Sequence, residues 1–245
     1  MVIYRFEYHK FLISQYKVAS SSFFQLMNGI QHSIVTKEEL SQLKVSLKLE
    51  GFTPVVVVFM RDFKTRIDSA FSHSMHLALN NSGYDAYAPR GTVKAYGGRH
   101  KGDVSVNLHH WTDQKRQSYL DKVVQEEGKG STKSEIITDL NAQDYQSFVD
   151  HIILKGKDLL NDHWGSQVQS CTHEGEFLPT IAHELTTDAK LKSDWSLYSE
   201  ISVPNTNHHT SIDTADYMLA ELQALYAQDI SFIEDIRSGN GTWNA

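Results

Sequence analysis

The chain has 245 residues, 40% of them hydrophobic, which is enough for one medium-sized α/β domain with a substantial core. Lys and Arg number 23 against 30 Asp and Glu, so the net charge is −7 and we expect no broad basic surface for nucleic acid. Cys171 is the one cysteine and cannot form an internal disulfide. Because no signal peptide and no run of about 18 apolar residues occurs, we expect a cytoplasmic protein that has no membrane contact.

The first part of the chain combines an apolar run with two helical patterns. Phe11 to Ser14 predicts a strand, and the polar loop after it leads into a helix from residue 23. Thr36 followed by Glu39 is a capping box, which predicts a second helix that ends near Gly51.

An unbroken run of apolar residues, Val55 to Met60, predicts a strand buried on both faces of a parallel sheet. Helical spacing continues from Phe63 to Ser74, so the order is β-α-α-β-α. Residues 80–140 are rich in turn signals and are interpreted as an insertion. The fold class is therefore α/β, in one domain that covers residues 1–245.

The last third of the chain has weaker signals. Residues 144–160 predict a helix, and the stretch from there to Asn207 is interpreted as irregular. Apolar residues at three-and-four spacing then predict one long amphipathic helix over 212–236.

Two segments that follow predicted strands can bind anions. Lys17 and the serines Ser20, Ser21 and Ser22 lie between a strand and a helix, where backbone N–H groups and the helix dipole favour phosphate or sulfate. The alternative is an ordinary serine N-cap beside a solvated lysine.

Arg61 lies at the carboxyl end of the buried strand, where ligands of open α/β sheets bind, and Ser69 lies two turns into the next helix. The alternative here is a structural Arg61–Asp62 salt bridge.

These segments carry a resemblance to a known family. The patterns KxxxSS at Lys17 and RDxxxRxxS at Arg61 resemble the paired nucleotide loops of sulfotransferases that use 3′-phosphoadenosine 5′-phosphosulfate (PAPS). The segment 163–171, HWGSQVQSC, is similar to a segment of the carbohydrate sulfotransferases of the chondroitin 4-O and HNK-1 type, and so are Glu184 with Asp188 and the segment 225–232. Three positions differ, because Tyr16, Phe63 and Ser166 stand where that family usually has proline.

The resemblance implies a P-loop-like three-layer sandwich with a central parallel sheet flanked by helices. It implies transfer of a sulfuryl group from PAPS to an acceptor hydroxyl of a carbohydrate or a small hydroxylated molecule, without a metal. The 5′-phosphosulfate is expected on Lys17, Val18, Ala19, Ser20, Ser21 and Ser22, and the 3′-phosphate on Arg61 and Ser69. Lys17 is also expected to stabilise charge during transfer. The oligomeric state stays open.

A general base has to take the proton of the acceptor hydroxyl. His163 is the preferred candidate because it lies in the matched HW segment, and Glu38, Glu39 and His32 are the alternatives. The capping box explains Glu39 without any catalytic role.

Other function classes have less support. A kinase-like phosphotransferase would need a GK[ST] loop and a second aspartate for magnesium, and the sequence has neither in context. An inactive nucleotide- or glycan-binding module is the other alternative. A metal site is not expected among the 13 histidines, because adjacent histidines rarely bind one ion and no HExxH motif occurs.

Overall fold

The computed structural model describes residues 1–16, 18–79, 165–204 and 216–242, together with the single positions 145, 146, 149, 152, 153 and 214. The chain divides into two compact units. Unit 1 comprises residues 1–66, 165–207 and 226–245, and unit 2 comprises residues 67–164 and 208–225. The predicted insertion at 80–140 lies outside the described residues, so the prediction of one domain with an insertion stays a prediction.

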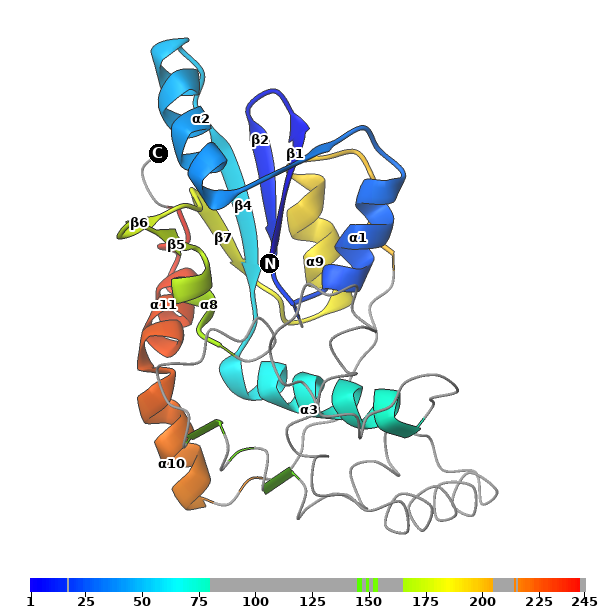
Figure 1. The fold of residues 1–245 in the computed structure, drawn as a ribbon, viewed down its shortest axis with the longest axis vertical. Coiled ribbons are helices and arrows are strands. Elements are labelled where there is room, and N and C mark those ends of the chain that lie inside the picture. Colours follow the sequence, from blue (N-terminus) through cyan, green and yellow to red (C-terminus); the bar gives the residue numbers. More distant parts are fainter. Residues whose placement is uncertain are drawn as a thin grey trace. The chain divides into compact units, whose positions relative to one another are not determined.

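Unit 1 contains a five-stranded sheet built from widely separated parts of the chain (Figure 1). In the spatial order β3-β1-β2-β4-β7, the strands are β3 (Ser33–Val35), β1 (Val2–Glu7), β2 (Lys10–Ser14), β4 (Val55–Met60) and β7 (Ile181–Glu184). Strands β2, β4 and β7 run parallel, whereas β1 is antiparallel to both of its neighbours. The sheet is therefore mixed, and the predicted parallel arrangement holds for β2, β4 and β7 only. A two-residue turn joins β1 to β2, and strands joined by so short a turn must be antiparallel.

The three parallel strands end at one edge of the sheet. Ile13 pairs with Val58, one residue before β2 ends, and Met60 pairs with Glu184, the last residues of β4 and β7. The connections that follow these strands therefore start from the same edge, where open α/β sheets bind their ligands.

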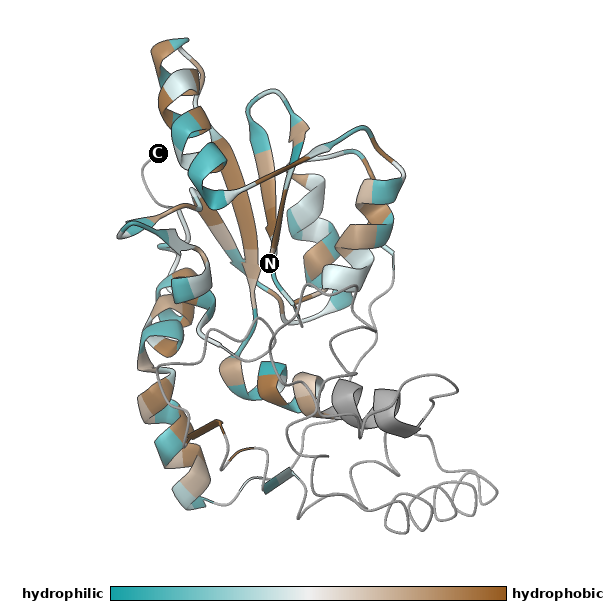
Figure 2. Ribbon diagram, viewed as in Figure 1, coloured by the Kyte–Doolittle hydropathy of each residue, from teal (hydrophilic) through white to brown (hydrophobic). Residues whose placement is uncertain are grey.

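The central strand β4 is buried on both faces and is apolar along its length (Figure 2). Val56, Val58 and Met60 pack into one core, and Val57 and Phe59 pack into a second core on the opposite face. This alternation follows from the strand period of two, because successive side chains point to opposite faces. Burial on both sides explains the unbroken apolar run.

Helices cover both faces of the sheet (Figure 1). One face packs against α1 (Ser20–Asn28) and α9 (Asp188–Ser196), and the other against α2 (Lys37–Leu49), α8 (Gln167–Ser170) and α11 (Ala227–Arg237). The predicted α/β fold with a central sheet flanked by helices is confirmed in unit 1.

Helix α2 begins as its sequence predicts. The Thr36 hydroxyl accepts from the Glu39 backbone N–H at 3.1 Å, and the Glu39 carboxylate accepts from the Thr36 N–H at 2.7 Å. These bonds form the complete capping box. The helix ends at Leu49, and Gly51 with a φ of 86° turns the chain into β4.

Residues 165–204 are more regular than predicted. They contain α8, α9, β7 and a small hairpin of β5 (Thr172–His173) and β6 (Glu176–Phe177). Strand β7 was missed because its four residues include His183 and Glu184 and show no apolar run. Pairing with β4, from Ile181 opposite Val57 onward, fixes it as a strand.

The predicted long C-terminal helix is wrong in one respect, because it is two helices. Helix α10 (Asp216–Leu225) belongs to unit 2, and α11 starts after Tyr226, which is buried against Phe63 with ring centroids 5.4 Å apart.

Unit 2 also holds most of α3 (Phe63–Leu79), where the Tyr145 hydroxyl donates to buried Asp68 at 2.6 Å. The predicted helix at 144–160 is described at only five positions.

Candidate functional site

The loop after β2 leads directly into α1, as predicted for the first anion-binding segment. Val18 is buried in the core, and Ala19 is the N-cap residue with a left-handed φ of 54°. Ser20, Ser21 and Ser22 form the first turn of the helix. Lys17, the residue with the central predicted role, lies outside the described residues.

No side chain caps the start of α1, so the alternative of an ordinary serine N-cap is not observed. The first backbone N–H groups of any α-helix have no acceptor within the helix, and here Phe23 N–H makes the first intrahelical bond, to the Ala19 carbonyl at 3.0 Å. A left-handed residue before a right-handed turn also directs successive N–H groups toward a common point. This start of α1 can therefore donate to an anion.

The segment after β4 starts α3 at the same edge of the sheet. The Asp62 carboxylate accepts from the backbone N–H of Thr65 at 3.0 Å and from its hydroxyl at 3.2 Å, so Asp62 caps the helix. Arg61 is partly exposed at the strand end in unit 1, and Ser69 is buried in the second turn of α3 in unit 2.

Gln167 joins this segment to the HWGSQVQSC segment. Its side chain accepts from the Arg61 backbone N–H at 2.9 Å and donates to the Arg61 carbonyl at 2.6 Å. The Gln15 amide in turn donates to the Gln167 carbonyl at 3.0 Å and to Cys171 Sγ. Two segments that carry the family resemblance thus contact each other through Gln167, which fixes the backbone of Arg61, and Gln15 from the end of β2 joins them.

Asp229 completes this arrangement from α11. Its fully buried carboxylate accepts from the Ser166 hydroxyl at 2.6 Å and from the backbone N–H groups of Gln167 and Val168 at 2.8 and 3.1 Å. Ser166 also caps α8 by accepting from Gln169 N–H at 3.2 Å. Ser166, one of the three departures from the family pattern, therefore has a structural role.

Arg66 holds the loop before α1 in place. Its buried guanidinium donates to the Tyr16 carbonyl at 3.3 Å and to the Gly165 carbonyl. The loop after β2 and the segment before α8 are therefore fastened to the start of α3.

Cys171 is buried beside this network, and burial raises the pKa of its thiol to about 11. A thiol with so high a pKa is protonated at neutral pH, so Cys171 is a core residue and no nucleophile.

A pocket of about 330 Å³ lies beside the start of α1. Its wall includes Tyr4 from β1, Tyr16 from the loop, and Ser20, Ser21 and Phe24 from α1. It lies at the carboxyl edge of β2, because Val2, which lines it, pairs with Ser14 at the end of that strand.

The four candidates for a general base have different surroundings. Glu39 is held in its capping box, which lowers the pKa of its carboxyl, and Glu38 is exposed on the same helix. His32 packs edge-on against Tyr4 with ring centroids 5.3 Å apart, so it contacts a wall of the pocket. His163 lies outside the described residues.

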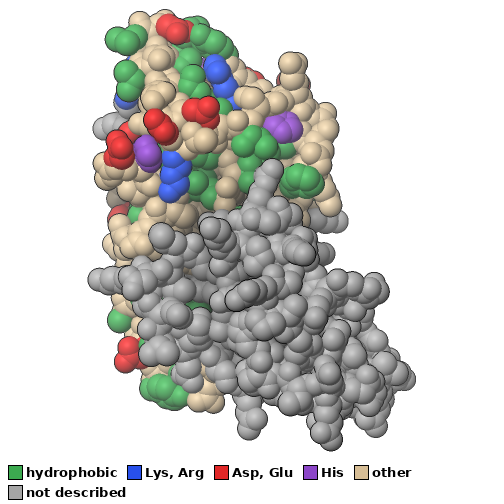
Figure 3. Space-filling model, in the orientation of Figure 1, with side chains coloured by type: hydrophobic (Ala, Val, Ile, Leu, Met, Phe, Trp, Pro, Cys, Tyr) green, Lys and Arg blue, Asp and Glu red, His purple; other side chains and the backbone are tan. Residues whose placement is uncertain are grey.

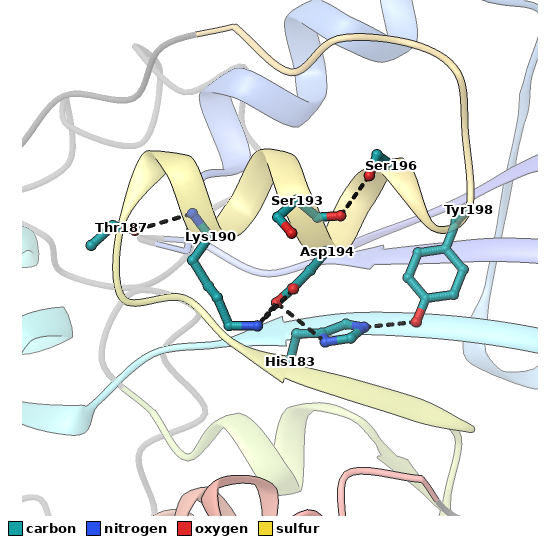
Figure 4. A network of polar contacts seen from close by, with 7 residues as sticks. All are labelled: His183, Thr187, Lys190, Ser193, Asp194, Ser196 and Tyr198. Carbon is teal, nitrogen blue, oxygen red and sulfur yellow. Dashed lines mark hydrogen bonds and ion pairs between the residues drawn. The ribbon is translucent and has the colours of Figure 1, made fainter.

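Sequence reasoning missed a chain of polar contacts between β7 and α9 (Figure 4). Nδ1 of His183 lies 3.3 Å from the Asp194 carboxylate, and Nε2 lies 2.7 Å from the Tyr198 hydroxyl. Lys190 Nζ contacts both carboxylate oxygens of Asp194, at 2.6 and 2.7 Å. Because a carboxylate only accepts, Nδ1 of the neutral ring carries the proton and Nε2 accepts from Tyr198.

The pKa values favour a structural role for this chain. Burial lowers the pKa of His183, although the Asp194 carboxylate opposes this, and burial raises the pKa of Tyr198 to about 12. At neutral pH both groups are uncharged, and the basic nitrogen of His183 is already occupied by Tyr198. These polar contacts fasten α9 to the edge strand β7. The sequence signal for these contacts is weak, because a single histidine beside Glu184 stands in a stretch interpreted as irregular.

Among the described residues, no three His, Cys, Asp or Glu side chains gather closely enough to hold a metal ion. In the same part of the chain, no helix has both the length and the apolar character needed to cross a membrane. No protein-family model, curated protein or solved structure matches the chain.

Proposed function

We propose that the protein is a sulfotransferase of P-loop-like fold that moves a sulfuryl group from PAPS to an acceptor hydroxyl, most simply of a carbohydrate. The observation that carries the proposal is that the two segments expected to bind the nucleotide follow neighbouring parallel strands and start from one edge of the sheet. The Gln167 contacts to Arg61 add support, because they join two motifs that the resemblance identified independently.

The proposed roles follow from the chemistry of the groups. Backbone N–H groups of Ser20, Ser21 and Ser22 and the α1 dipole suit the 5′-phosphosulfate, and Lys17 would neutralise charge on the transferring group. Arg61 and Ser69 would bind the 3′-phosphate. The acceptor oxygen forms a new bond to sulfur while the bond from sulfur to the phosphate oxygen breaks, and 3′-phosphoadenosine 5′-phosphate leaves.

The proton of the acceptor hydroxyl passes to a base. His163 remains the proposed base, and His32 is the described alternative, since it contacts the pocket wall. Replacing each histidine by Ala separates them, because only loss of the base should lower kcat without weakening nucleotide binding.

The surface favours an acceptor of low charge. On the face shown in Figure 3, Lys and Arg side chains of the described residues lie as separate small groups among acidic ones, without a continuous basic groove. With a net charge of −7, this argues for a neutral or lightly charged acceptor over a heavily sulfated chain, and for an enzyme that does not bind nucleic acid.

Calorimetric titration with 3′-phosphoadenosine 5′-phosphate tests the proposal. We expect binding by the native chain and a loss of about tenfold or more in affinity for Arg61→Ala, as for one charge-assisted phosphate contact. Lys17→Ala should abolish transfer and keep the fold. Lys48→Ala, an exposed lysine on α2, is the control and should bind normally.

Other outcomes support the other function classes. Heat with ATP and magnesium but none with 3′-phosphoadenosine 5′-phosphate would favour a phosphotransferase. Binding of the nucleotide without transfer to any hydroxyl would favour an inactive nucleotide- or glycan-binding module.

A further inference from the structure

The pocket beside α1 has a defined chemical character. Its wall carries three aromatic rings, those of Tyr4, Tyr16 and Phe24. Hydroxyl and amide groups of Ser20, Ser21 and Gln25 lie among them, and no Asp, Glu, Lys, Arg or His is among the described lining residues. The described part of the wall offers apolar ring faces and neutral hydrogen-bonding groups and carries no charged side chain, so it favours an uncharged ligand.

Phe24 is the side chain that most needs an explanation. It is 57% exposed, whereas its neighbour Phe23 is 1% exposed and packs against Phe59 and Trp195. Phe23 therefore provides the core contact of α1, and Phe24 has no comparable packing role. An exposed aromatic ring on the wall of a pocket provides a surface on which another ring can stack.

The pocket adjoins the segment proposed to hold the transferable group. Ser20 and Ser21 line the pocket and also form the first turn of α1, where the phosphosulfate is proposed to bind. Tyr16 lines the pocket from the loop and directly precedes Lys17 in the chain. A ligand in this pocket would thus be next to the same backbone N–H groups.

We propose that this pocket is the acceptor subsite and that it takes an uncharged, hydroxylated ring compound, which stacks on Phe24 and bonds to the serine and glutamine side chains. That the ligand is the acceptor rests on the proposed sulfotransferase function. Its chemical class is inferred from the residues that line the pocket. Its volume of about 330 Å³ limits the bound part to about one or two rings.

The test uses two probes that differ only at C6 of the sugar, 4-nitrophenyl β-D-glucoside with a neutral CH2OH group and the corresponding glucuronide with a carboxylate. Saturation-transfer NMR and calorimetry on the full chain should detect the glucoside, and the carboxylate of the glucuronide should weaken binding. Phe24→Ala should lower affinity for the glucoside about tenfold, as expected for one lost ring contact. Gln25→Ala should lower it less, since one neutral hydrogen bond is lost.

Leu49→Ala is the matched control, because Leu49 is 85% exposed on α2 and does not line the pocket. It should bind the glucoside as the native chain does. Both Phe24 and Gln25 are exposed, so these variants should keep the native circular dichroism spectrum. The proposal is overturned if the glucoside does not bind, if Phe24→Ala binds it unchanged, or if the glucuronide binds as tightly.

Titration with 3′-phosphoadenosine 5′-phosphate separates this inference from the proposed function. Phe24→Ala should bind the nucleotide like the native chain. If the glucoside binds through Phe24 while the nucleotide does not bind at all, the neutral-ligand site stands and the sulfotransferase proposal falls. If the nucleotide binds and the glucoside does not, the sulfotransferase proposal stands and this assignment of the pocket falls.

Discussion

Two helices that start near the carboxyl edge of the sheet begin in opposite ways. Helix α8 is capped by the Ser166 hydroxyl, and the buried Asp229 carboxylate accepts from two of its N–H groups. Helix α1 starts at left-handed Ala19 with no side-chain cap. The first N–H groups of α8 are therefore paired with acceptors of the protein itself, whereas those of α1 have no side-chain acceptor and can donate to a ligand.

The largest expected effect comes from removing the partner that satisfies α8. Asp229→Ala leaves two backbone N–H groups and the Ser166 hydroxyl without their acceptor in a buried site, so we expect a loss of about 3 kcal/mol in the free energy of unfolding. Urea unfolding measures it. Asp235→Ala, an exposed carboxylate on the same helix, should change stability by less than about 0.5 kcal/mol, and an equal loss there would contradict the account.

Gln167→Ala should have the next largest effect. It removes two hydrogen bonds from the buried Gln167 side chain to the Arg61 backbone and should lower the free energy of unfolding by about 2 kcal/mol. Affinity for 3′-phosphoadenosine 5′-phosphate should fall as well, because the position of Arg61 is loosened. Gln169→Ala on the exposed side of α8 is the control. A destabilised Gln167→Ala variant with native nucleotide affinity would show that Arg61 needs no such support.

A pair of N-cap substitutions compares the two helices directly. Ser166→Ala should cost about 1 kcal/mol, because α8 loses its capping hydroxyl. Ala19→Gly should instead stabilise by about 0.5 kcal/mol, because glycine adopts a positive φ without strain. Thermal unfolding of both variants measures the two changes in stability. Changes of the same sign would contradict the proposed contrast between the starts of α8 and α1.

The smallest expected effect is a dependence of stability on pH at the chain of contacts between β7 and α9. Burial lowers the pKa of His183 below its ordinary value of 6.5, so between these two pKa values the unfolded state binds more protons than the folded state. The contribution of His183 to the free energy of unfolding should therefore be complete above pH 6.5 and should decrease as the pH falls below that value. His183→Gln should flatten this slope in urea unfolding at pH 5 to 8, while His173→Gln should not.

The outcome of the sequence predictions depended on how local each signal was. The capping box at Thr36 and the buried run at Val55 to Met60 predicted α2 and β4 correctly, because a helix start and a doubly buried strand each depend on residues close in the chain. Strand β7 was missed because four residues are too few for a pattern and its partner lies more than 100 residues earlier. The antiparallel strands β1 and β3 were missed because neither has a strong apolar run.

The sequence by itself determined the central strand, the helices next to it, and the positions of the two anion-binding segments along the chain, since each depends on short-range patterns of burial and capping. Only the tertiary structure decided that Gln167 holds the backbone of Arg61 from 106 positions away, and that Asp229 satisfies α8 from α11. The tertiary structure also created the pocket of Tyr4, Tyr16 and Phe24, because strand pairing brings β1 beside the end of β2 and α1. Contacts of this kind depend on packing between distant segments, which no local pattern records.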